Sequence, residues 1–134
     1  MRTAELMQTE VQTISPDARL SDAAATLADA RVSALPVVDE TGGLIGVISL
    51  TDILALEEER GDAATTRATL LERTAVRDVM TPEPVTITPD EEIREAARRM
   101  LDADVHRLMV VAEGRMVGVI SITDIIRAVS TGLI

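Results

Sequence analysis

Two short segments of the chain carry the same polar residues directly after an apolar run. Residues 46–53 read GVISLTDI and residues 118–125 read GVISITDI, so seven of the eight positions are identical. Where a helix begins after such a run, its free N–H groups attract an anion such as phosphate. An aspartate carboxylate at the same place can accept paired hydrogen bonds from a vicinal diol, as on a ribose. The polar residues concerned are Ser49, Thr51 and Asp52 in the first copy and Ser121, Thr123 and Asp124 in the second.

A purely structural role accounts for the same residues. Threonine and aspartate are good capping residues, so the Thr-Asp pair of each copy is expected to start a helix, each cap contributing about 1 kcal/mol. Gly46 and Gly118 have no side chain, which leaves their backbone open to close approach by another group. From the spacing alone, ligand binding and helix capping both remain open interpretations.

The similarity extends far beyond these motifs. Residues 7–38 align without gaps on residues 80–111, and one residue is lost before the GVIS segments. Chance does not produce such agreement, so the chain is a tandem duplication of a unit of about 50 residues. Because a unit of that size is marginal alone, we expect the two copies to share a core around a pseudo-twofold axis. The expected domains are residues 7–60 and 76–131, joined by a polar connector at 61–75 with a helical turn at 68–72.

Each copy predicts the element order β-α-β-β-α, an α+β fold built from a duplicated α/β-type repeat. A short strand at Thr13-Ile14, or Thr86-Ile87, precedes a helix with apolar residues at helical spacing, over 20–30 or 93–103. A hairpin follows, with strands at 35–39 and 44–49, or at 108–112 and 116–121. The near-continuous apolar run of its second strand predicts burial on both faces.

Apolar side chains near the motifs could hold a flat base without any aromatic ring. These are Ile14, Leu35, Pro36 and Ile48 in the first copy, and Ile87, Leu108, Met109 and Ile120 in the second. Met109 is also expected, with Met80, Met100 and Met116, to fill the core.

Composition excludes several classes of protein. The 134 residues include no Cys, which excludes disulfide scaffolds, thiol nucleophiles and Cys-ligated metal sites. They include no aromatic residue, and the net charge is −10, both of which argue against nucleic-acid binding. The single histidine, His106, cannot form a His-based metal cluster. No apolar run approaches a membrane span and the N-terminus has no secretion-signal pattern, so we expect a cytoplasmic protein.

Together, these motifs resemble a tandem pair of CBS domains, the regulatory modules named after cystathionine β-synthase, a pair also called a Bateman module. The second copy matches through VMTP at 79–82, TITP at 86–89, VHRLMVV at 105–111 and GVISITD at 118–124. The first matches through TISP at 13–16, ALPVVD at 34–39 and GVISLTD at 46–52. The resemblance covers residues from about 7 to 129.

The resemblance implies regulation rather than catalysis. CBS pairs commonly bind adenosyl compounds such as AMP, ADP, ATP or S-adenosylmethionine in two clefts between the repeats. In the family, the aspartate of this motif holds the ribose hydroxyls, which implies that role for Asp52 and Asp124. The serines and threonines before it commonly help to hold the ribose or phosphate, which implies that role for Ser49, Thr51, Ser121 and Thr123. In the family, the residues matching Thr13-Ile14 and Thr86-Ile87 often border the base, and in some members a His-Arg pair matching His106-Arg107 contacts phosphate. The expected ligand-binding residues also include Ala34, Leu35, Pro36, Leu108 and Met109.

The resemblance also implies assembly and output. The first copy has Ser33-Ala34 where the second has His106-Arg107, so we expect one good nucleotide site and one weaker or empty one. A homodimer formed through helices and a separate, unidentified effector protein are expected, with a regulatory nucleotide but no cofactor and no metal.

Alternatives remain open for the residues and for the function. His106 is also compatible with a partly buried structural role, and Arg107 with a surface ion pair. The whole chain is compatible with a ligand-free dimerisation scaffold or with an S-adenosylmethionine sensor. An enzyme is the least favoured interpretation, because the chain has no Cys, no Lys and one His.

Overall fold

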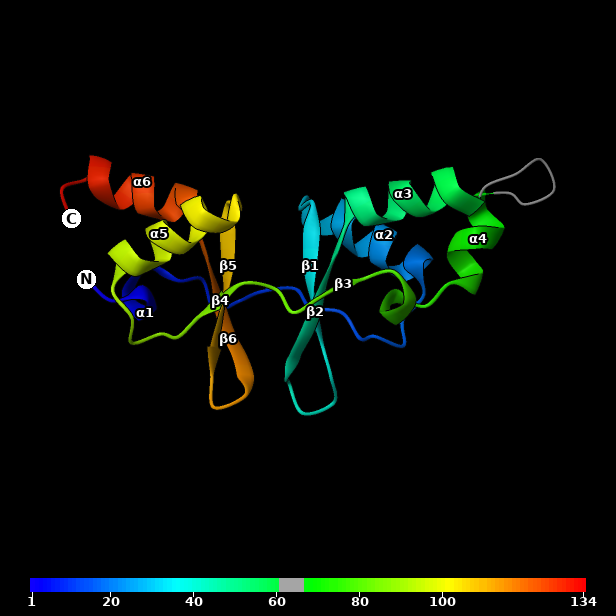
Figure 1. Ribbon diagram of the computed structural model, residues 1–134, viewed down its shortest axis with the longest axis horizontal. Coiled ribbons are helices and arrows are strands. Elements are labelled where there is room, and N and C mark those ends of the chain that lie inside the picture. Colours follow the sequence, from blue (N-terminus) through cyan, green and yellow to red (C-terminus); the bar gives the residue numbers. More distant parts are fainter. Residues whose placement is uncertain (61–66) are drawn as a thin grey trace. The chain divides into compact units, whose positions relative to one another are not determined.

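The computed structural model describes residues 1–60 and 67–134, which form two compact units of mixed helix and strand (Figure 1). Unit 1 consists of Met1–Val11 and Pro84–Ile134, and unit 2 of Gln12–Glu83. The duplication of an α+β repeat predicted from the sequence is confirmed, since a bridging residue or short strand, a helix, a β-hairpin and a second helix follow one another in both units.

Unit 2 is built on a small antiparallel sheet. Its elements are α2 (Leu20–Ala30), β1 (Ala34–Val38), β2 (Leu44–Ser49), α3 (Leu50–Arg60), α4 (Arg67–Arg73), the 3-10 helix η1 (Val76–Asp78) and β3 (Thr81–Pro82). The strand order is β1-β2-β3. On the free edge of β1, Ile14 forms a parallel bridge to Val37, so the expected first strand is reduced to a single bridging residue.

Unit 1 repeats this arrangement. Its elements are α1 (Thr3–Leu6), β4 (Thr86–Ile87), α5 (Ile93–Ala103), β5 (Arg107–Ala112), β6 (Arg115–Ser121) and α6 (Ile122–Ser130). β4 is parallel to β5, and β5 is antiparallel to β6. Gln8 bridges to Val119 on the outer edge of β6, where β3 pairs with β2 in unit 2. Both sheets therefore have four pairing positions in the same order.

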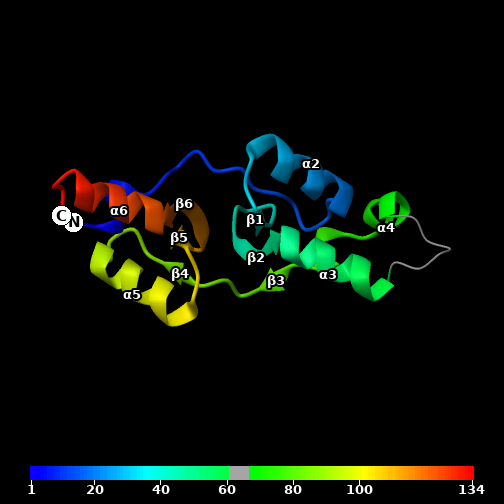
Figure 2. The ribbon, with the colours of Figure 1, turned by 90° about the horizontal axis from the view of Figure 1, so that it is seen from above.

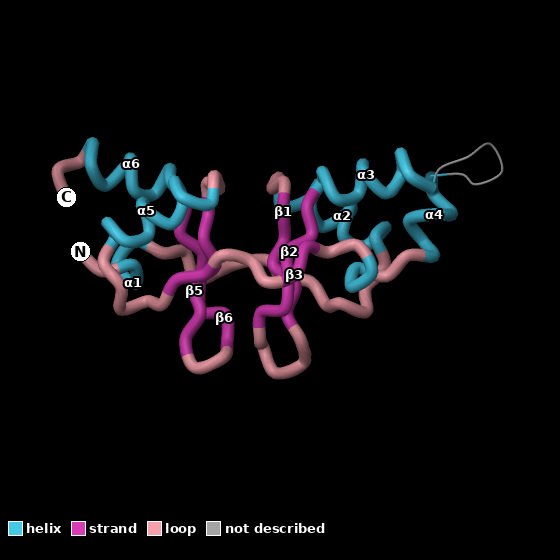
Figure 3. Tube along the Cα trace, in the orientation of Figure 1, coloured by secondary structure: helices cyan, strands magenta, loops and turns pink. Residues whose placement is uncertain are grey.

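The helices pack on one face of each sheet, as Figures 1 and 3 show for α2 and α3 in unit 2 and for α5 and α6 in unit 1. Helices α2 and α5 have the bounds expected from their periodicity and bury the expected faces. Each ends in a left-handed residue, Arg31 or Asp104, with φ of 55°. Figure 2 shows from above that α4 lies beside α2 and α3.

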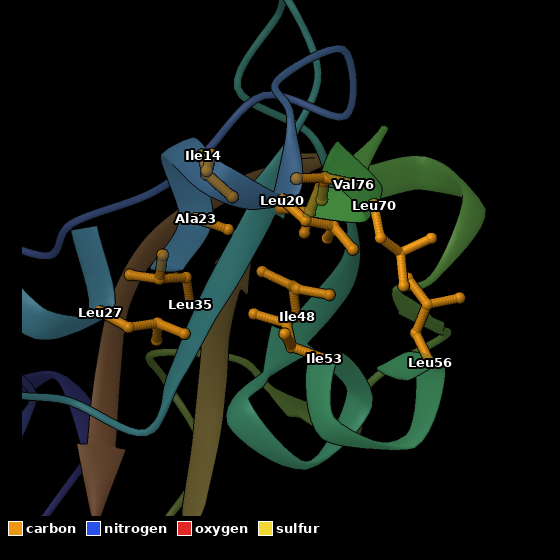
Figure 4. Packing of buried hydrophobic residues seen from close by; sticks show 11 residues of the cluster. Ile14, Leu20, Ala23, Leu27, Leu35, Ile48, Ile53, Leu56, Leu70 and Val76 are labelled. Atoms are coloured by element: carbon orange, nitrogen blue, oxygen red, sulfur yellow. The ribbon is translucent and has the colours of Figure 1, made fainter. Parts of the chain in front are cut away.

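Each unit has its own hydrophobic cluster. In unit 2, Leu56 of α3 and Leu70 of α4 lie together at one end of a cluster that continues to Leu20 and Leu35 (Figure 4). In unit 1, the corresponding cluster includes Met100, which is 2% exposed. The prediction that the second hairpin strand is buried on both faces was wrong: in β2 and β6 buried residues alternate with half-buried ones.

A further feature was not expected: the start of each sequence repeat, with the residues just before it, belongs to the unit formed by the rest of the other repeat. We call residues 1–11 and 74–83 the exchanged segments. Thr3 N donates to Glu91 O at 2.8 Å in unit 1, and Val76 N donates to Ala18 O at 2.8 Å in unit 2. Thr3 and Val76 are both fully buried. The sequence repeat and the compact unit therefore do not coincide.

The expected connector takes part in unit 2. Its residues 61–66 lie outside the described part of the chain. Residues 67–73 form α4, which contains the expected helical turn and buries Leu70. Leu20 N, at the start of α2, donates to Thr74 O at 2.9 Å. This end of the connector is therefore part of the structure that starts α2.

Candidate ligand-binding site

The two aspartates of the repeated motif lie in matching capping boxes. At the start of α6, Ser121 N donates to Asp124 Oδ2 at 2.9 Å, and Asp124 N donates to Ser121 Oγ at 3.2 Å. In unit 2, Ser49 N donates to Asp52 Oδ2 at 2.9 Å, and Asp52 N donates to Ser49 Oγ at 3.1 Å. These reciprocal bonds satisfy N–H groups that a helix start leaves free.

The capping boxes correct one detail of the sequence prediction. Both helices begin one residue before the Thr-Asp pair, because the serine is the cap and the aspartate is the third helical residue. Thr51 and Thr123 therefore do not cap; their side chains are exposed in the first turn. The aspartates do take part in capping, so the structural role left open by the sequence is real.

The capping box uses one oxygen of each carboxylate and leaves the other to a residue of an exchanged segment. Gln8 Nε2 donates to Asp124 Oδ1 at 3.2 Å, and Thr81 Oγ1 donates to Asp52 Oδ1 at 3.3 Å. Sequence reasoning missed both residues. The signal was present, because each directly follows a methionine of an aligned pair, Met7 or Met80.

The exchanged segments also explain why both motifs begin with a glycine. A Cβ added to Gly118 would lie 2.7 Å from Gln8 O, and one added to Gly46 would lie 2.9 Å from Thr81 O. The group that closely approaches these glycines is thus the exchanged segment. A ligand is not needed to explain them.

His106 and Arg107 lie beside the start of α6. Arg107 pairs with Ser121 in the strand register, and Ile122 N donates to His106 O at 2.9 Å. Both side chains are exposed, and among the described residues Arg107 has no ion pair in the structure. A guanidinium next to a helix N-terminus suits a phosphate group.

In unit 2, the residue at the position equivalent to Arg107 is uncharged. There Ala34 pairs with Ser49, and Leu50 N donates to Ser33 O at 2.9 Å. The backbone is the same as in unit 1, but the side chains are neutral and small. The sequence indicated that the two copies differ in positive charge. The structure places this difference at matching positions of the two units, Arg107 and Ala34.

The residues expected to border a base fall into two groups. Thr13 is exposed and Thr86 half-buried at the edges of their sheets, where Thr86 pairs with Met109. The others are nearly or fully covered by their own unit. Leu35, Ile48, Ile87, Leu108 and Ile120 are at most 1% exposed, Pro36 is buried, and Ile14 and Met109 are 8% exposed. The side chains of this group lie in or against the hydrophobic cores, beneath the exposed residues of the candidate site.

Thr86 is held by a side chain that sequence reasoning also missed. Arg99 Nη1 on α5 donates to Thr86 O at 2.7 Å, while Arg99 Nη2 donates to Glu91 Oε1 at 2.6 Å. Glu95 joins the same network, and its hydrogen bonds from Arg98 and then Arg99 lower the pKa of its carboxyl below the ordinary 4.5. The residue aligned with Arg99 in the first copy is Thr26, so this support is confined to unit 1.

Comparison with known proteins agrees with the duplicated motif and fold. The CBS domain family matches residues 4–59 and again residues 76–131. The chain is a tandem pair of CBS domains. Among the described residues, no helix combines the length and apolar character that crossing a bilayer requires.

The CBS pair has relatives from plants and bacteria. It is 31% identical over 135 residues to the chloroplastic protein CBSX2 of Arabidopsis thaliana, covering 86% of this chain and 57% of CBSX2. It is 28% identical over 121 residues to YhcV of Bacillus subtilis, covering 90% and 80%. The chain thus spans little more than half the length of CBSX2.

Solved structures share the fold closely. The crystal structure of CBSX2 in complex with AMP has a TM-score of 0.82 at 27% identity, covering 99% of this chain and 98% of that one. The CBS pair of protein MJ0100, solved with 5-methylthioadenosine and S-adenosyl-L-methionine, has a TM-score of 0.78 at 23% identity, covering 96% and 99%. The second likeness shows the fold alone.

Proposed function

We propose that this CBS pair is a regulatory module that binds an adenine nucleotide and performs no catalysis on it. The observation that carries the proposal is the duplicated capping box. In both units it fixes a carboxylate at a helix start and leaves Oδ1 of Asp52 and of Asp124 outside the box. A carboxylate oxygen held in this way can accept a hydrogen bond from a ribose hydroxyl.

The exposed groups around Asp124 supply the rest of the recognition. The Thr123 hydroxyl lies in the first turn of α6, where the helix dipole favours an anion. Arg107 offers a guanidinium that can bind phosphate through two parallel hydrogen bonds. Because unit 2 has Ala34 at the matching position, the nucleotide whose phosphate meets Arg107 binds more tightly than the other.

The AMP complex of CBSX2 supports the adenine nucleotide class. AMP, ADP and ATP are therefore the first ligands to compare, with S-adenosylmethionine as the alternative. Binding would shift the equilibrium between two arrangements of the pair and so change its interaction with an effector protein.

A binding experiment with matched variants tests the proposal. Asp52→Asn and Asp124→Asn keep the size of the side chain and an oxygen for the capping bond, but remove the negative charge. Asp22→Asn is the control, because Asp22 makes the same kind of bond at the start of α2, accepting from Arg19 N at 3.0 Å. We expect calorimetry to show roughly tenfold or greater loss of affinity for the two motif variants and none for the control. Wild-type protein that binds none of the four ligands would refute the proposal.

The absence of aromatic residues allows a simpler first measurement. The chain has almost no absorbance at 280 nm, so an adenine carried through purification would be visible as a band near 260 nm. Mass analysis of the filtrate after denaturation would identify it.

We further propose that the module forms a homodimer through α3 and α6. Matching apolar side chains are exposed on the two helices: Leu50 and Leu54 at 51% and 47%, and Ile122 and Ile126 at 36% and 60%. Light scattering of Ile126→Glu is expected to show a monomer. Leu101→Glu, at a 77% exposed position on α5, serves as the control and should remain dimeric. A dimer that binds no nucleotide would instead favour the scaffold function.

A further inference from the structure

The carboxylates of Asp52 and Asp124, which we propose bind the ribose hydroxyls, are not equally accessible to a ligand. Asp124 accepts three side-chain or backbone hydrogen bonds, from Ser121 N, Ser121 Oγ and Gln8 Nε2. From the described part of the chain, Asp52 accepts two, from Ser49 N and Thr81 Oγ1. Asp124 is 9% exposed, whereas Asp52 is half-buried. The carboxylate in unit 1 is thus both more covered and more fully satisfied.

The position of Gln8 is set by its backbone rather than by its side chain. Gln8 N donates to Val119 O at 2.8 Å, and Val119 N donates to Gln8 O at 2.9 Å. This reciprocal pair fixes Gln8 against β6, directly beside Gly118. The carboxamide is therefore held within reach of Asp124 whether or not a ligand is present.

The two bonds to Oδ1 differ in chemistry. The Thr81 hydroxyl is both donor and acceptor and can turn away from Asp52 to bond to a ligand hydroxyl. The Gln8 carboxamide nitrogen is only a donor, and a carboxylate oxygen accepts about two hydrogen bonds. Oδ2 of Asp124 already accepts two, from Ser121 N and Ser121 Oγ, and Oδ1 accepts one, from Gln8 Nε2. These bonds leave one acceptor position for the two donors of a vicinal diol, so Gln8 competes with the second hydroxyl. The copies therefore differ at this position as well as at Arg107.

We propose that Gln8 gates the Asp124 carboxylate: a vicinal diol binds there by displacing the Gln8 carboxamide from Oδ1. This inference rests on the proposed nucleotide binding and adds a specificity-determining residue to it. The two interactions are also coupled: because the Gln8 bond weakens ligand binding at Asp124, ligand binding must weaken the Gln8 bond. The Gln8 side chain then becomes the part of the exchanged segment 1–11 that responds to occupancy, whereas at Asp52 the Thr81 hydroxyl can turn away from the carboxylate.

The composition of the chain offers a direct spectroscopic test. The sequence contains two glutamines, Gln8 and Gln12, and no asparagine. An amide ¹H–¹⁵N spectrum therefore shows two pairs of side-chain carboxamide peaks, which Gln8→Ala and Gln12→Ala assign. Gln12 is exposed and lies in unit 2, so its peaks are an internal reference. Without ligand, Asp124→Ala should move the Gln8 pair and leave the Gln12 pair in place.

The ligand experiment compares AMP with 2′-deoxy-AMP, which lacks one of the two hydroxyls. We expect AMP to move the Gln8 pair toward the position of a free carboxamide and 2′-deoxy-AMP to leave it unmoved. Backbone peaks that shift with AMP while the Gln8 pair stays fixed would overturn the gating and leave nucleotide binding intact. No shift of any peak with AMP, ATP or S-adenosylmethionine would overturn the proposed function, and the gating with it.

An affinity measurement provides the second test. In the Asp52→Asn background, which leaves the Asp124 carboxylate, Gln8→Ala should tighten AMP binding about threefold to tenfold, because it removes a competing bond to a charged group. Thr9→Ala, at the adjacent exposed position, is the control and should leave the affinity unchanged. Unchanged or weakened binding by Gln8→Ala would overturn the proposal.

Discussion

Replacing Gly118 with alanine tests how tightly the exchanged segment 1–11 is packed in unit 1. The new Cβ would lie 2.7 Å from Gln8 O and 3.0 Å from Met7 Sδ. Non-bonded contacts to carbon settle nearer 3.5 Å, so the overlap is roughly 0.5–0.8 Å. The flexible thioether of Met7 can move aside. The Gln8 carbonyl cannot do so without disturbing its bond from Val119 N.

The expected cost follows from these contacts. If the segment moves away, two backbone hydrogen bonds between Gln8 and Val119 are weakened, each contributing about 1 kcal/mol. If it stays, the strand is strained by about 1–3 kcal/mol, as for other overpacked sites. Both routes give a loss near 2 kcal/mol, which for a chain of this size lowers Tm by about 6 °C or more.

Far-ultraviolet circular dichroism can follow the unfolding without any aromatic residue. Gly114→Ala is the matched control, because Gly114 has no atom within 4 Å of an added Cβ, although its φ of +76° adds some backbone strain. Only Gly118→Ala should also move the carboxamide peaks of Gln8. A Gly118→Ala protein with the wild-type Tm and unmoved Gln8 peaks would refute the described packing of the segment.

Three other changes have defined outcomes. Asp39 closes the β1–β2 turn by accepting hydrogen bonds from the Thr41 hydroxyl and Gly43 N, which lower the pKa of its carboxyl below 3.8. A lowered pKa stabilises the fold above pH 3.8, and this stabilisation is lost as the pH falls through the lowered value. Asp39→Asn should therefore melt below wild type near neutral pH, with a difference that shrinks in acid; a constant difference would contradict this. Asp104→Gly should raise the stability by about 0.5–1 kcal/mol in urea unfolding, because glycine adopts the left-handed conformation found there without strain. Met100→Ala should lower it by about 2–5 kcal/mol, because Met100 is 2% exposed in the core of unit 1, and a loss well below that range would show that the site collapses around the smaller side chain.

The helices and hairpins of the repeat were predictable because their signals are local. The apolar spacing that places Leu20 and Leu27 on one face of α2 is a property of eleven consecutive residues. The helix starts were displaced by one residue, because serine, threonine and aspartate all favour such positions and sequence spacing does not choose among them. The geometry does choose, since Ser121 Oγ reaches the N–H of the third helical residue.

The duplication, the family and the two motif aspartates can be recognised without any coordinates. These depend on residue identity and on spacing within about 50 residues. Three features require the folded chain: the unit that each exchanged segment joins, the close backbone contacts that favour glycine at positions 46 and 118, and the hydrogen bond to Oδ1 of Asp124. Those contacts join residues as far apart as Gln8 and Asp124, 116 positions along the chain. No local pattern encodes such a contact, because it forms only when the chain has folded back on itself.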